Sequence, residues 1–349
     1  MRKQNLVAVD LFCGIGGLTY GFKKAGIDVV AGIDSDESCK YAYEINNSAK
    51  FICKDISDVT GKEINKLYPR GSIRILVGCA PCQTFSQHTQ KNRNRNKDER
   101  WFLLYQFLRI VKETKPDIIS MENVPQLKNY SIFKDFVNGL KEEKYSVFFD
   151  IINSADYGIP QSRKRLVLLA SKFSKIKLID FKNNDKHTVR DAIGNLPKIR
   201  CGECDKSDSL HRSSKLNTLN MKRIRKSKPG GTWLDWDKDL RLRCHKKKRG
   251  LSYKSVYGRM SWDKPSPTIT TEFYSYGTGR FGHPSQNRAI SLREGALLQT
   301  FPINYKFIPD GEIPSFTEMG RHIGNAVPVK LGKVIGKSIK NHIKENQYE

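Results

Sequence analysis

The chain has 349 residues, of which 62 are Lys or Arg and 36 are Asp or Glu, so its formal net charge is +26. A chain of this length is expected to form two lobes rather than one core. It contains no apolar run of the ~18 residues that span a bilayer, and the charge excess favours a polyanionic partner such as nucleic acid. A Lys-rich composition explains part of the excess, but basic residues gather at 91–100, 222–228 and 241–249, which we expect to be loops.

Short apolar runs alternate with helical patterns through the first half of the chain. Runs that are nearly all apolar are typical of strands buried on both faces of a parallel sheet, and the last two runs resemble a closing pair. Helices are predicted over 18–25, which Gly26 ends, and over 101–114, which Pro116 closes. The pattern predicts a doubly wound, mostly parallel α/β domain with ligands at the carboxyl ends of its strands. The runs that predict strands cover 6–11, 27–34, 73–79, 117–123, 145–153 and 165–171.

The regular alternation ends near residue 171. Residues 172–285 are rich in Lys, Arg, Asn, Ser and Gly with short aromatic pieces, and we expect them to form a smaller, irregular lobe. Helical patterns return over 291–301 and 328–344. The expected organisation is a first domain at 1–171, the irregular lobe at 172–285, and a C-terminal segment at 286–349 that packs back on the first domain.

The first predicted strand runs into a glycine-rich turn, DLFCGIGG at 10–17, which precedes a helix. Its glycines let the backbone pass close to a ligand, and the helix N-terminus faces that ligand. Asp34 ends the second strand about 20 residues on, where it is placed to bind a ribose hydroxyl pair. Asp55 follows a third, short strand and is placed to accept from an adenine amino group. Acidic residues here favour a nucleoside with a positive charge nearby, although the alternative that both are turn or cap residues stays open.

Chemistry-bearing side chains follow the next two predicted strands. With the short strand before Asp55 counted as the third, Cys82 comes after the fourth strand, 73–79, and Glu122 closes the fifth, 117–123. Because neighbouring strand ends of a doubly wound sheet face one cleft, we expect the thiol and the carboxyl group side by side. The segment QSRKR at 161–165 precedes the last strand and adds Arg163 and Arg165 to the same rim. These residues predict a nucleophile, an acid and two cations beside a nucleoside pocket.

With these residues the chain resembles the DNA (cytosine-5) methyltransferases of bacterial modification systems. The matching segments occur in the family's order and nearly span the chain, and the largely unmatched part lies where that family keeps its variable target-recognition region. The resemblance implies a class I methyltransferase-like fold, S-adenosylmethionine as methyl donor, and methylation of cytosine carbon 5 within a specific duplex DNA sequence. The matching segments are FCGIGG at 12–17, APCQTFS at 80–86, ENV at 122–124, QSRKR at 161–165, REGALLQTFP at 293–302 and GNAVP at 324–328.

The resemblance also implies a covalent mechanism. The thiolate of Cys82 adds to carbon 6 of the base, which gives carbon 5 the electron density to take a methyl group. A free thiol with a pKa of ~8.5 is only a few per cent ionised at neutral pH, so nearby positive charge is expected to raise the thiolate fraction. Glu122 contacts ring nitrogen 3 and the amino group, and Arg163 and Arg165 hold the base oxygen or the flanking phosphate.

On the cofactor side, the resemblance implies a pocket built from several segments of the chain. Phe12 stacks near the adenine, the glycine loop lines the amino-acid end, and Asn325 reaches in from GNAVP. Asp34 departs from the family, which often has Glu there, so the shorter side chain would bind the ribose after a small shift or through water. The implied cofactor-binding residues are Phe12, Gly14, Gly16, Gly17, Leu18, Asp34, Asp55, Ile56, Pro81, Leu103 and Asn325.

A base inside a duplex is out of reach, so the resemblance implies that the target cytosine is flipped out at a cost of a few kcal/mol. The basic stretch at 83–100 follows Cys82 directly and is suited to close over the extruded base and grip the backbone. Specificity is expected from side chains of the irregular lobe in the major groove, with Trp233 as an aromatic candidate. The further DNA-binding candidates are Gln83, Ser86, Arg93, Arg95, Arg223, Arg225, Arg259 and Arg280.

Other functions compete with this interpretation. An RNA cytosine-5 methyltransferase acting on tRNA shares the PCQ and ENV elements, and a non-catalytic DNA-binding protein would share the charge. A nucleotide-dependent oxidoreductase leaves Cys82, ENV and QSRKR without roles. CGEC at 201–204 has the spacing of zinc ligands, but the adjacent Cys244 and His245 rarely both ligate, so we predict no metal.

The expected setting follows from the same features. The cysteines are expected to be reduced thiols, and the protein is expected to be a cytoplasmic, nucleoid-associated monomer without a membrane segment. Its predicted partner is duplex DNA, and its functional counterpart is a cognate restriction endonuclease.

Overall fold

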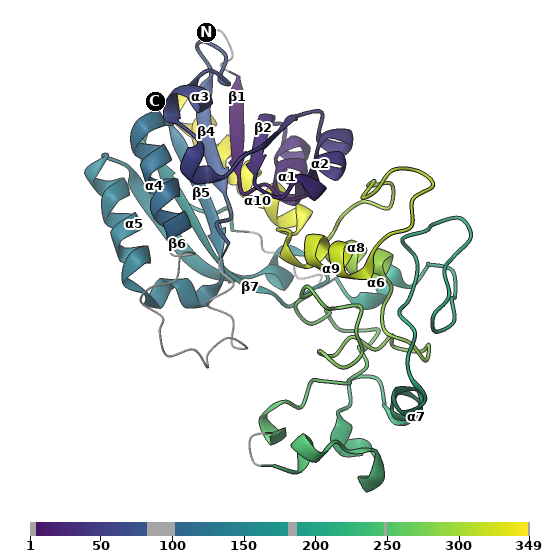
Figure 1. Ribbon diagram of the computed structural model, residues 1–349. Coiled ribbons are helices and arrows are strands. Elements are labelled where there is room, and N and C mark those ends of the chain that lie inside the picture. The colour runs from purple at the N-terminus through teal and green to yellow at the C-terminus, as the bar shows by residue number, and fades with distance from the viewer. Residues whose placement is uncertain (1–4, 82–101, 181–186, 248–249, 348–349) are drawn as a thin grey trace. The chain divides into compact units, whose positions relative to one another are not determined.

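The computed structural model describes residues 5–81, 102–180, 187–247 and 250–347 (Figure 1). The chain divides into two units that it visits alternately. The sheet unit comprises Met1–Asn153, Lys164–Lys182 and Val327–Glu349, and the loop unit comprises Ser154–Arg163 and Asn183–Ala326. This division differs from the expected one, because residues 286–326 belong to the loop unit and only the last helix joins the sheet unit. No described helix is long and apolar enough to cross a membrane.

The sheet unit is built on seven strands in the order β3-β2-β1-β4-β5-β7-β6. The first five in this order pair in parallel, while β7 is antiparallel to both of its neighbours. The mostly parallel α/β sheet and its closing pair are therefore confirmed. The strands are β1 (Leu6–Leu11), β2 (Asp28–Asp34), β3 (Lys50–Cys53), β4 (Ile73–Gly78), β5 (Ile118–Asn123), β6 (Ser146–Asn153) and β7 (Lys164–Ser171).

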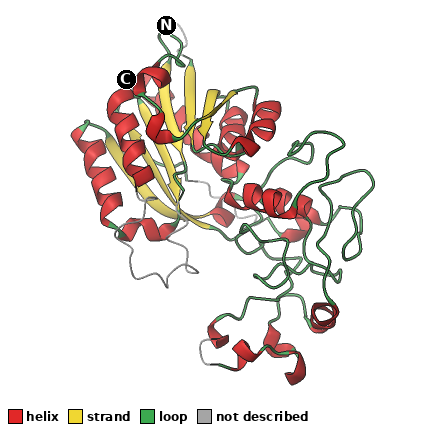
Figure 2. Ribbon diagram, in the orientation of Figure 1, coloured by secondary structure: helices red, strands yellow, loops and turns green. Residues whose placement is uncertain are grey.

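Helices cover both faces of this sheet (Figure 2). The largest core cluster lies between one face and the helices α3, α4 and α5, and it includes Leu11, Leu76, Phe107 and Phe136. Such burial of apolar area, at roughly 25 cal/mol per Å², is the main stabilising contribution. The helices are α1 (Gly17–Ala25), α2 (Lys40–Asn47), α3 (Gly61–Asn65), α4 (Phe102–Thr114), α5 (Ser131–Glu142) and α10 (Val329–Gln347), with 3-10 turns η1 (Glu37–Cys39), η2 (Ile56–Asp58) and η7 (Pro125–Asn129).

Helix α10 packs against α1 through small residues. A β-carbon added to Gly21 of α1 would collide with the backbone of α10 at Val329 and Lys333, and one added to Gly332 would lie 2.9 Å from the carbonyl oxygen of Leu18. Gly336 faces Ala25 in the same way. The glycines let the two backbones approach closely, which holds a late segment of the chain against the first helix.

The loop unit contains short helices joined by long irregular segments. Its described residues form isolated β-bridges, such as Gln161 with Ser266 and Arg259 with Gly282, in place of strands. The α-helices are α6 (Val189–Ile193), α7 (Thr218–Lys226), α8 (Leu292–Leu298) and α9 (Phe316–Asn325). The 3-10 turns are η8 (Ser154–Tyr157), η9 (Trp233–Asp235), η10 (Lys238–Leu240), η11 (Arg243–Lys246) and η12 (Gly250–Ser252).

The expectation that the basic run 222–228 is a loop is wrong. Residues 222–226 lie in α7, which Asn217 caps by accepting from the backbone N–H of Asn220. Ile224 of α7 is fully buried in an aromatic cluster with Trp233 and Trp236. Tertiary packing of one apolar residue thus supports a helix whose sequence is mostly basic.

Buried arginines connect the irregular segments of the loop unit. Arg288 is fully buried and donates to both carboxylate oxygens of Glu294, each at 2.7 Å, and to the carbonyl oxygens of Ile199 and Ala289. The guanidinium holds the pKa of Glu294 at about 2 against the opposing effect of burial. His283, next to this pair, has its pKa lowered to about 4, chiefly by burial. The neutral imidazole accepts from the backbone N–H of Gln286.

Candidate active site

The carboxyl ends of β1 to β6 and the start of β7 meet at the same edge of the sheet. Because β1 to β5 are parallel, their carboxyl ends lie together, and the antiparallel β7 begins at that edge. The edge carries the turn after β1, Asp34 at the end of β2, Cys79 directly after β4, Glu122 as the second-to-last residue of β5, and Arg165 near the start of β7. The sequence predicted this convergence, except for Cys79.

The turn after β1 is held in an unusual backbone conformation. Phe12, Gly14 and Gly16 have φ angles of 58°, 50° and 83°. For Phe12 this left-handed conformation costs about 1–3 kcal/mol and is typical of functional sites. No atom lies within 4 Å of a β-carbon built on Gly14, so the turn is open on that side. Gly16 caps α1 without a side-chain hydrogen bond, so the first N–H groups of α1 have no side-chain acceptor there.

Asp34 closes the turn from the neighbouring strand. Its Oδ2 accepts from the backbone N–H of Gly14 at 2.8 Å, and its Oδ1 accepts from that of Asp36 at 3.0 Å. Burial raises the pKa of Asp34, although these two bonds oppose the rise. A carboxylate oxygen offers about two acceptor positions, so Asp34 keeps capacity for a ligand's hydroxyl groups.

A buried polar network lies beneath the turn. Asp10 of β1 is 1% exposed and accepts from the hydroxyl of Thr19 at 2.6 Å, and Tyr43 lies 3.1 Å from the same hydroxyl. Burial raises the pKa of Asp10 to about 7. Asp10 was not among the predicted site residues, although an acidic residue within an otherwise apolar strand was a signal available in the sequence.

Asp55 behaves as a cap in the structure. It lies before η2, is exposed, and accepts from the backbone N–H and the hydroxyl of Ser57 at 2.8 and 2.6 Å. These bonds lower its pKa. The next residue, Ile56, is buried in the core. The alternative that Asp55 is a cap residue therefore agrees with the structure. A second role of Asp55, in binding a nucleoside, stays a proposal.

Glu122 is 3% exposed and is held from two sides. The thiol of Cys79 donates to its Oε2 at 3.1 Å. Arg165 places its Nε 3.0 Å from Oε1, an ion pair that lacks the geometry of a hydrogen bond. Asn123 donates from its side-chain amide to the carbonyl oxygen of Ala80 at 3.0 Å and so ties the end of β5 to the segment after β4.

The remaining catalytic and cofactor candidates are divided between the units. In the sheet unit, Leu18 is buried in α1, Leu103 is half-buried at the start of α4, and Pro81 is exposed. In the loop unit, Arg163 is 4% exposed and donates to the carbonyl oxygens of Ile269 and Gly324 at 3.0 and 3.5 Å. Asn325 is exposed at the end of α9 in the same unit. The QSRKR segment is therefore split, with Arg163 and Arg165 in different units.

Several predicted residues lie outside the described part of the chain. They include the predicted nucleophile and the candidates that follow it, and their assignments stay predictions. They are Cys82, Gln83, Ser86, Arg93 and Arg95.

The predicted DNA-contacting arginines of the loop unit have different environments. Arg259 is 5% exposed, and its guanidinium donates to the carbonyl oxygens of Ile224, His283 and Gln286. Arg223 is 7% exposed and donates to the carbonyl oxygen of Leu240. Because both guanidinium groups donate to carbonyl oxygens inside the loop unit, we do not propose them as DNA contacts.

Arg280 is half-buried and donates to the carbonyl oxygen of Gly231, while Arg225 of α7 is exposed. Trp233, the aromatic candidate, is 1% exposed and stacks on His245 with ring centroids 4.1 Å apart. Arg225 is therefore the one of these four arginines whose side chain is open to a nucleic acid.

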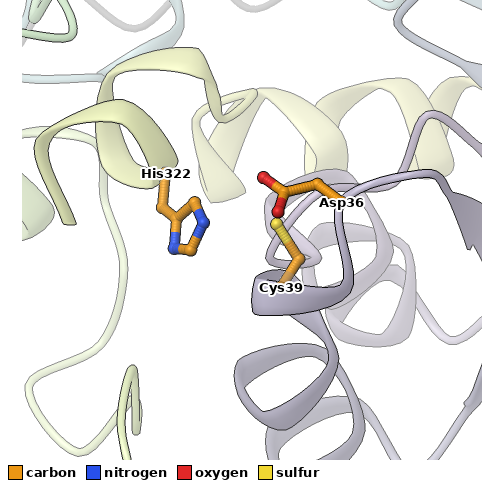
Figure 3. A group of neighbouring side chains, drawn as sticks. All are labelled: Asp36, Cys39 and His322. Atoms are coloured by element: carbon orange, nitrogen blue, oxygen red, sulfur yellow. The ribbon is translucent and has the colours of Figure 1, made fainter. Parts of the chain in front are cut away.

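Asp36, Cys39 and His322 carry groups that can bind a metal ion. Asp36 caps η1 and Cys39 is the last residue of this turn (Figure 3). Asp36 accepts from the backbone N–H and the hydroxyl of Ser38. His322, drawn in the same figure, belongs to α9 of the loop unit, where its Nε2 lies 3.3 Å from a guanidinium nitrogen of Arg321. Because these residues come from different units, we assign them no ion.

Comparison with known proteins is consistent with the geometry. The model of the family described as C-5 cytosine-specific DNA methylase matches residues 6–341. The Type II methylase M.HgiDII of Herpetosiphon aurantiacus is 53% identical over 340 residues, covering 96% of this chain and 95% of the relative. The Type II methyltransferase M1.BsuMI of Bacillus subtilis is 31% identical over 358 residues, covering 96% and 80%. A solved structure from E. coli, a putative DNA modification methyltransferase encoded within a prophage, has a similar fold, with a TM-score of 0.74, 23% identity, and coverage of 97% and 100%.

Proposed function

The chain belongs to the C-5 cytosine-specific DNA methylases, and from this membership we infer that it methylates cytosine carbon 5 in a specific duplex DNA sequence through a covalent adduct with Cys82. The observation that carries the proposal is the buried carboxyl group of Glu122, held between Cys79 and Arg165 at the carboxyl edge of the sheet. Such a group is suited to contact the polar edge of a pyrimidine that has left the duplex.

The turn after β1 fits a nucleoside cofactor. The space beside Gly14, the remaining acceptor capacity of Asp34 and the uncapped start of α1 suit a ligand with ribose hydroxyls and a carboxylate. S-adenosylmethionine supplies an electrophilic methyl group on a positively charged sulfur. Asp34 would accept from the ribose hydroxyls, α1 would face the carboxylate, and Phe12 would contact the adenine. The carboxyl group of Asp34 gives this edge an acidic character that favours a cationic ligand.

The chain's own groups supply the activation of the base. In the proposed reaction the thiolate of Cys82 forms a bond to carbon 6 of cytosine, and the electron pair of the 5,6 double bond moves to carbon 5, which becomes the nucleophile. A proton held between the Glu122 carboxyl group and nitrogen 3 would offset the negative charge that develops on the ring, and a carboxyl oxygen would accept from the amino group. After the methyl group is in place, carbon 5 loses its proton and the bond to Cys82 breaks, which restores the double bond and the thiolate.

The loop unit supports duplex DNA as the substrate. Residues 217–258 carry 13 Lys or Arg against 3 Asp, and much of this charge is exposed on and after α7. Each phosphate neutralised by such a residue releases counterions and strengthens binding. The relatives named above are Type II enzymes, so we propose that this chain protects the DNA of its host from a restriction endonuclease of the same specificity.

The proposal is tested by tritium transfer from labelled S-adenosylmethionine to duplex DNA or to tRNA, comparing the wild type with Cys82→Ser and Glu122→Gln. We expect label in duplex DNA for the wild type and none for Cys82→Ser. Oligonucleotides that contain 5-fluorocytosine at the target should become irreversibly attached to the wild type, because fluorine cannot leave as the proton does. Label in tRNA alone would move the substrate to RNA, and label without attachment would exclude the covalent route. Bisulfite sequencing of DNA from an expressing host then gives the target sequence.

A further inference from the structure

Cys79 is an additional cysteine at the catalytic edge of the sheet. It follows β4 directly, and Gly78 of β4 pairs with Met121 of β5, so the register brings Cys79 beside Glu122. The backbone N–H of Cys79 donates to the carbonyl oxygen of Leu11 at 3.4 Å, which anchors the residue to β1. Its half-buried thiol is therefore presented to the carboxyl group from a fixed backbone position.

The two oxygens of Glu122 have different neighbours. The thiol of Cys79 donates to Oε2 at 3.1 Å, while the Nε of Arg165 lies 3.0 Å from Oε1. The torsion that turns a Glu carboxyl group is broad and roughly two-fold, so one neighbour alone leaves the plane of the group weakly defined. With one neighbour at each oxygen, the plane of the carboxyl group is fixed, and Oε1 and Oε2 cannot exchange places.

A thiol differs from the other donors that could stand here. Its S–H is a weak donor, so it orients the carboxyl group while leaving most of the acceptor strength of the oxygens for the base. Ala at position 79 would leave Oε2 without this donor. Ser would keep a donor on a shorter arm, because a C–O bond is shorter than a C–S bond.

We propose that Cys79 is a positioning residue for the methyl transfer, whose thiol fixes the orientation of the Glu122 carboxyl group toward the flipped cytosine. This inference rests on the proposed role of Glu122. It assigns Cys79 no contact with the substrate or the cofactor, so its effect should appear in turnover rather than in binding.

The test compares Cys79→Ala and Cys79→Ser with the wild type, using DNA that lacks cytosine methylation and tritiated S-adenosylmethionine. For Cys79→Ala we expect kcat to fall by roughly three- to tenfold, the range that follows from losing one ordinary hydrogen bond, because the thiol is a weak donor. KM for DNA and for S-adenosylmethionine should stay within about twofold, because ground-state binding is unchanged. Cys79→Ser should recover part of the lost kcat. The control is Cys53→Ala, which removes an exposed thiol at the end of β3 and should leave kcat unchanged.

A second comparison separates positioning from a general effect on folding. Glu122→Asp keeps a carboxyl group but withdraws it from the thiol by one methylene, so Cys79→Ala should change kcat less than about twofold in this background. Equal losses in both backgrounds, unchanged kcat in Cys79→Ala, or a loss carried by KM would each overturn the inference. A wild type that labels no DNA would instead refute the proposed function, so the two failures are distinguishable.

Discussion

The two units satisfy their buried backbone groups in different ways. In the sheet unit, ladder hydrogen bonds between strands pair the carbonyl oxygens, and acidic side chains such as Asp10, Asp34 and Glu122 remain for chemistry at one edge. In the loop unit, whose described residues form no extended strands, arginine side chains reach the carbonyl oxygens instead. A guanidinium has five N–H donors, so a single arginine can join several irregular segments.

Part of the net positive charge lies inside the loop unit, where it does not meet a polyanion. Arg223, Arg259 and Arg288 contribute to the formal charge of +26 but are at most 7% exposed. Their charge is therefore used to hold the fold, and the part available to a polyanion comes from exposed residues such as Arg225 and Lys228. Whether a basic residue in an irregular segment binds a polyanion or stabilises the fold therefore depends on the groups around it in the structure.

The largest expected effect comes from breaking the buried ion pair of the loop unit. Arg288→Met removes the only cation that contacts both oxygens of Glu294 among the described residues, and it leaves a carboxylate buried without its partner. Such a loss costs about 3–5 kcal/mol, which urea denaturation of the wild type and the variant would measure. Arg200→Met is the matched control, because that side chain is 90% exposed. Equal stability of Arg288→Met and Arg200→Met would contradict the role of buried arginines.

The second effect concerns the buried acid of the sheet unit and depends on pH. Because burial raises the pKa of Asp10 to about 7, the unfolded chain loses this proton near pH 4 while the folded protein keeps it. The stability that this group contributes is fully present below about pH 4, and it is lost as the pH rises from about 4 to about 7. Asp10→Asn keeps an acceptor for Thr19 and lacks this titration, so relative to the wild type it should gain roughly 2–4 kcal/mol between pH 5 and pH 8.

Urea denaturation at both pH values gives the difference for Asp10→Asn, with Asp28→Asn, at the exposed start of β2, as the control. A difference between wild type and Asp10→Asn that is the same at pH 5 and pH 8 would show that Asp10 titrates normally.

A smaller effect is expected from Arg259→Lys. The ammonium group has three donors against five and lacks the planar fork, so it cannot reproduce the bonds to Ile224, His283 and Gln286 together. We expect a loss of about 1–3 kcal/mol in the free energy of unfolding. Arg225→Lys, on the exposed face of α7, provides the comparison and should leave the unfolding midpoint where it is.

The smallest effect separates DNA binding from stability. Arg225→Ala should unfold at the same urea concentration as the wild type but bind duplex DNA more weakly. The slope of log affinity against log salt should fall by about one, as expected for one lost phosphate contact. Fluorescence anisotropy at several salt concentrations measures the slope. An unchanged slope would place the DNA contacts elsewhere on the protein.

The elements of the sheet unit were largely predictable from the sequence. The run 6–11 became β1 at the same residues, and the runs at 73–79 and 117–123 became β4 and β5 with one residue fewer each. These runs are short and mostly apolar, which favours strands buried on both faces, because a helix would need a longer run. The convergence of Asp34, Glu122 and Arg165 then follows from parallel topology, and β7 adds its start to the same edge.

The loop unit was less predictable for physical reasons. Helix α7 depends on Ile224 packing among aromatic residues that are distant in the sequence, and the basic residues around it hide this periodicity. The roles of Arg223 and Arg259 depend on which carbonyl oxygens lack partners, which no local pattern records. Cys79 was not predicted, because its contact with Glu122 depends on how β4 pairs with β5, although the position directly after a strand was itself a signal.

The close packing of α10 on α1 has a consequence for synthesis in the cell. Gly21 and Gly332 seal the first helix against a segment made more than three hundred residues later. While the ribosome is still translating the loop unit, the α1 surface that α10 covers has no native cover from that helix. That α1 surface is therefore exposed to aggregation until Val329–Gln347 has been synthesised. The sheet unit is completed only after that, so it is among the last parts of the protein to assemble.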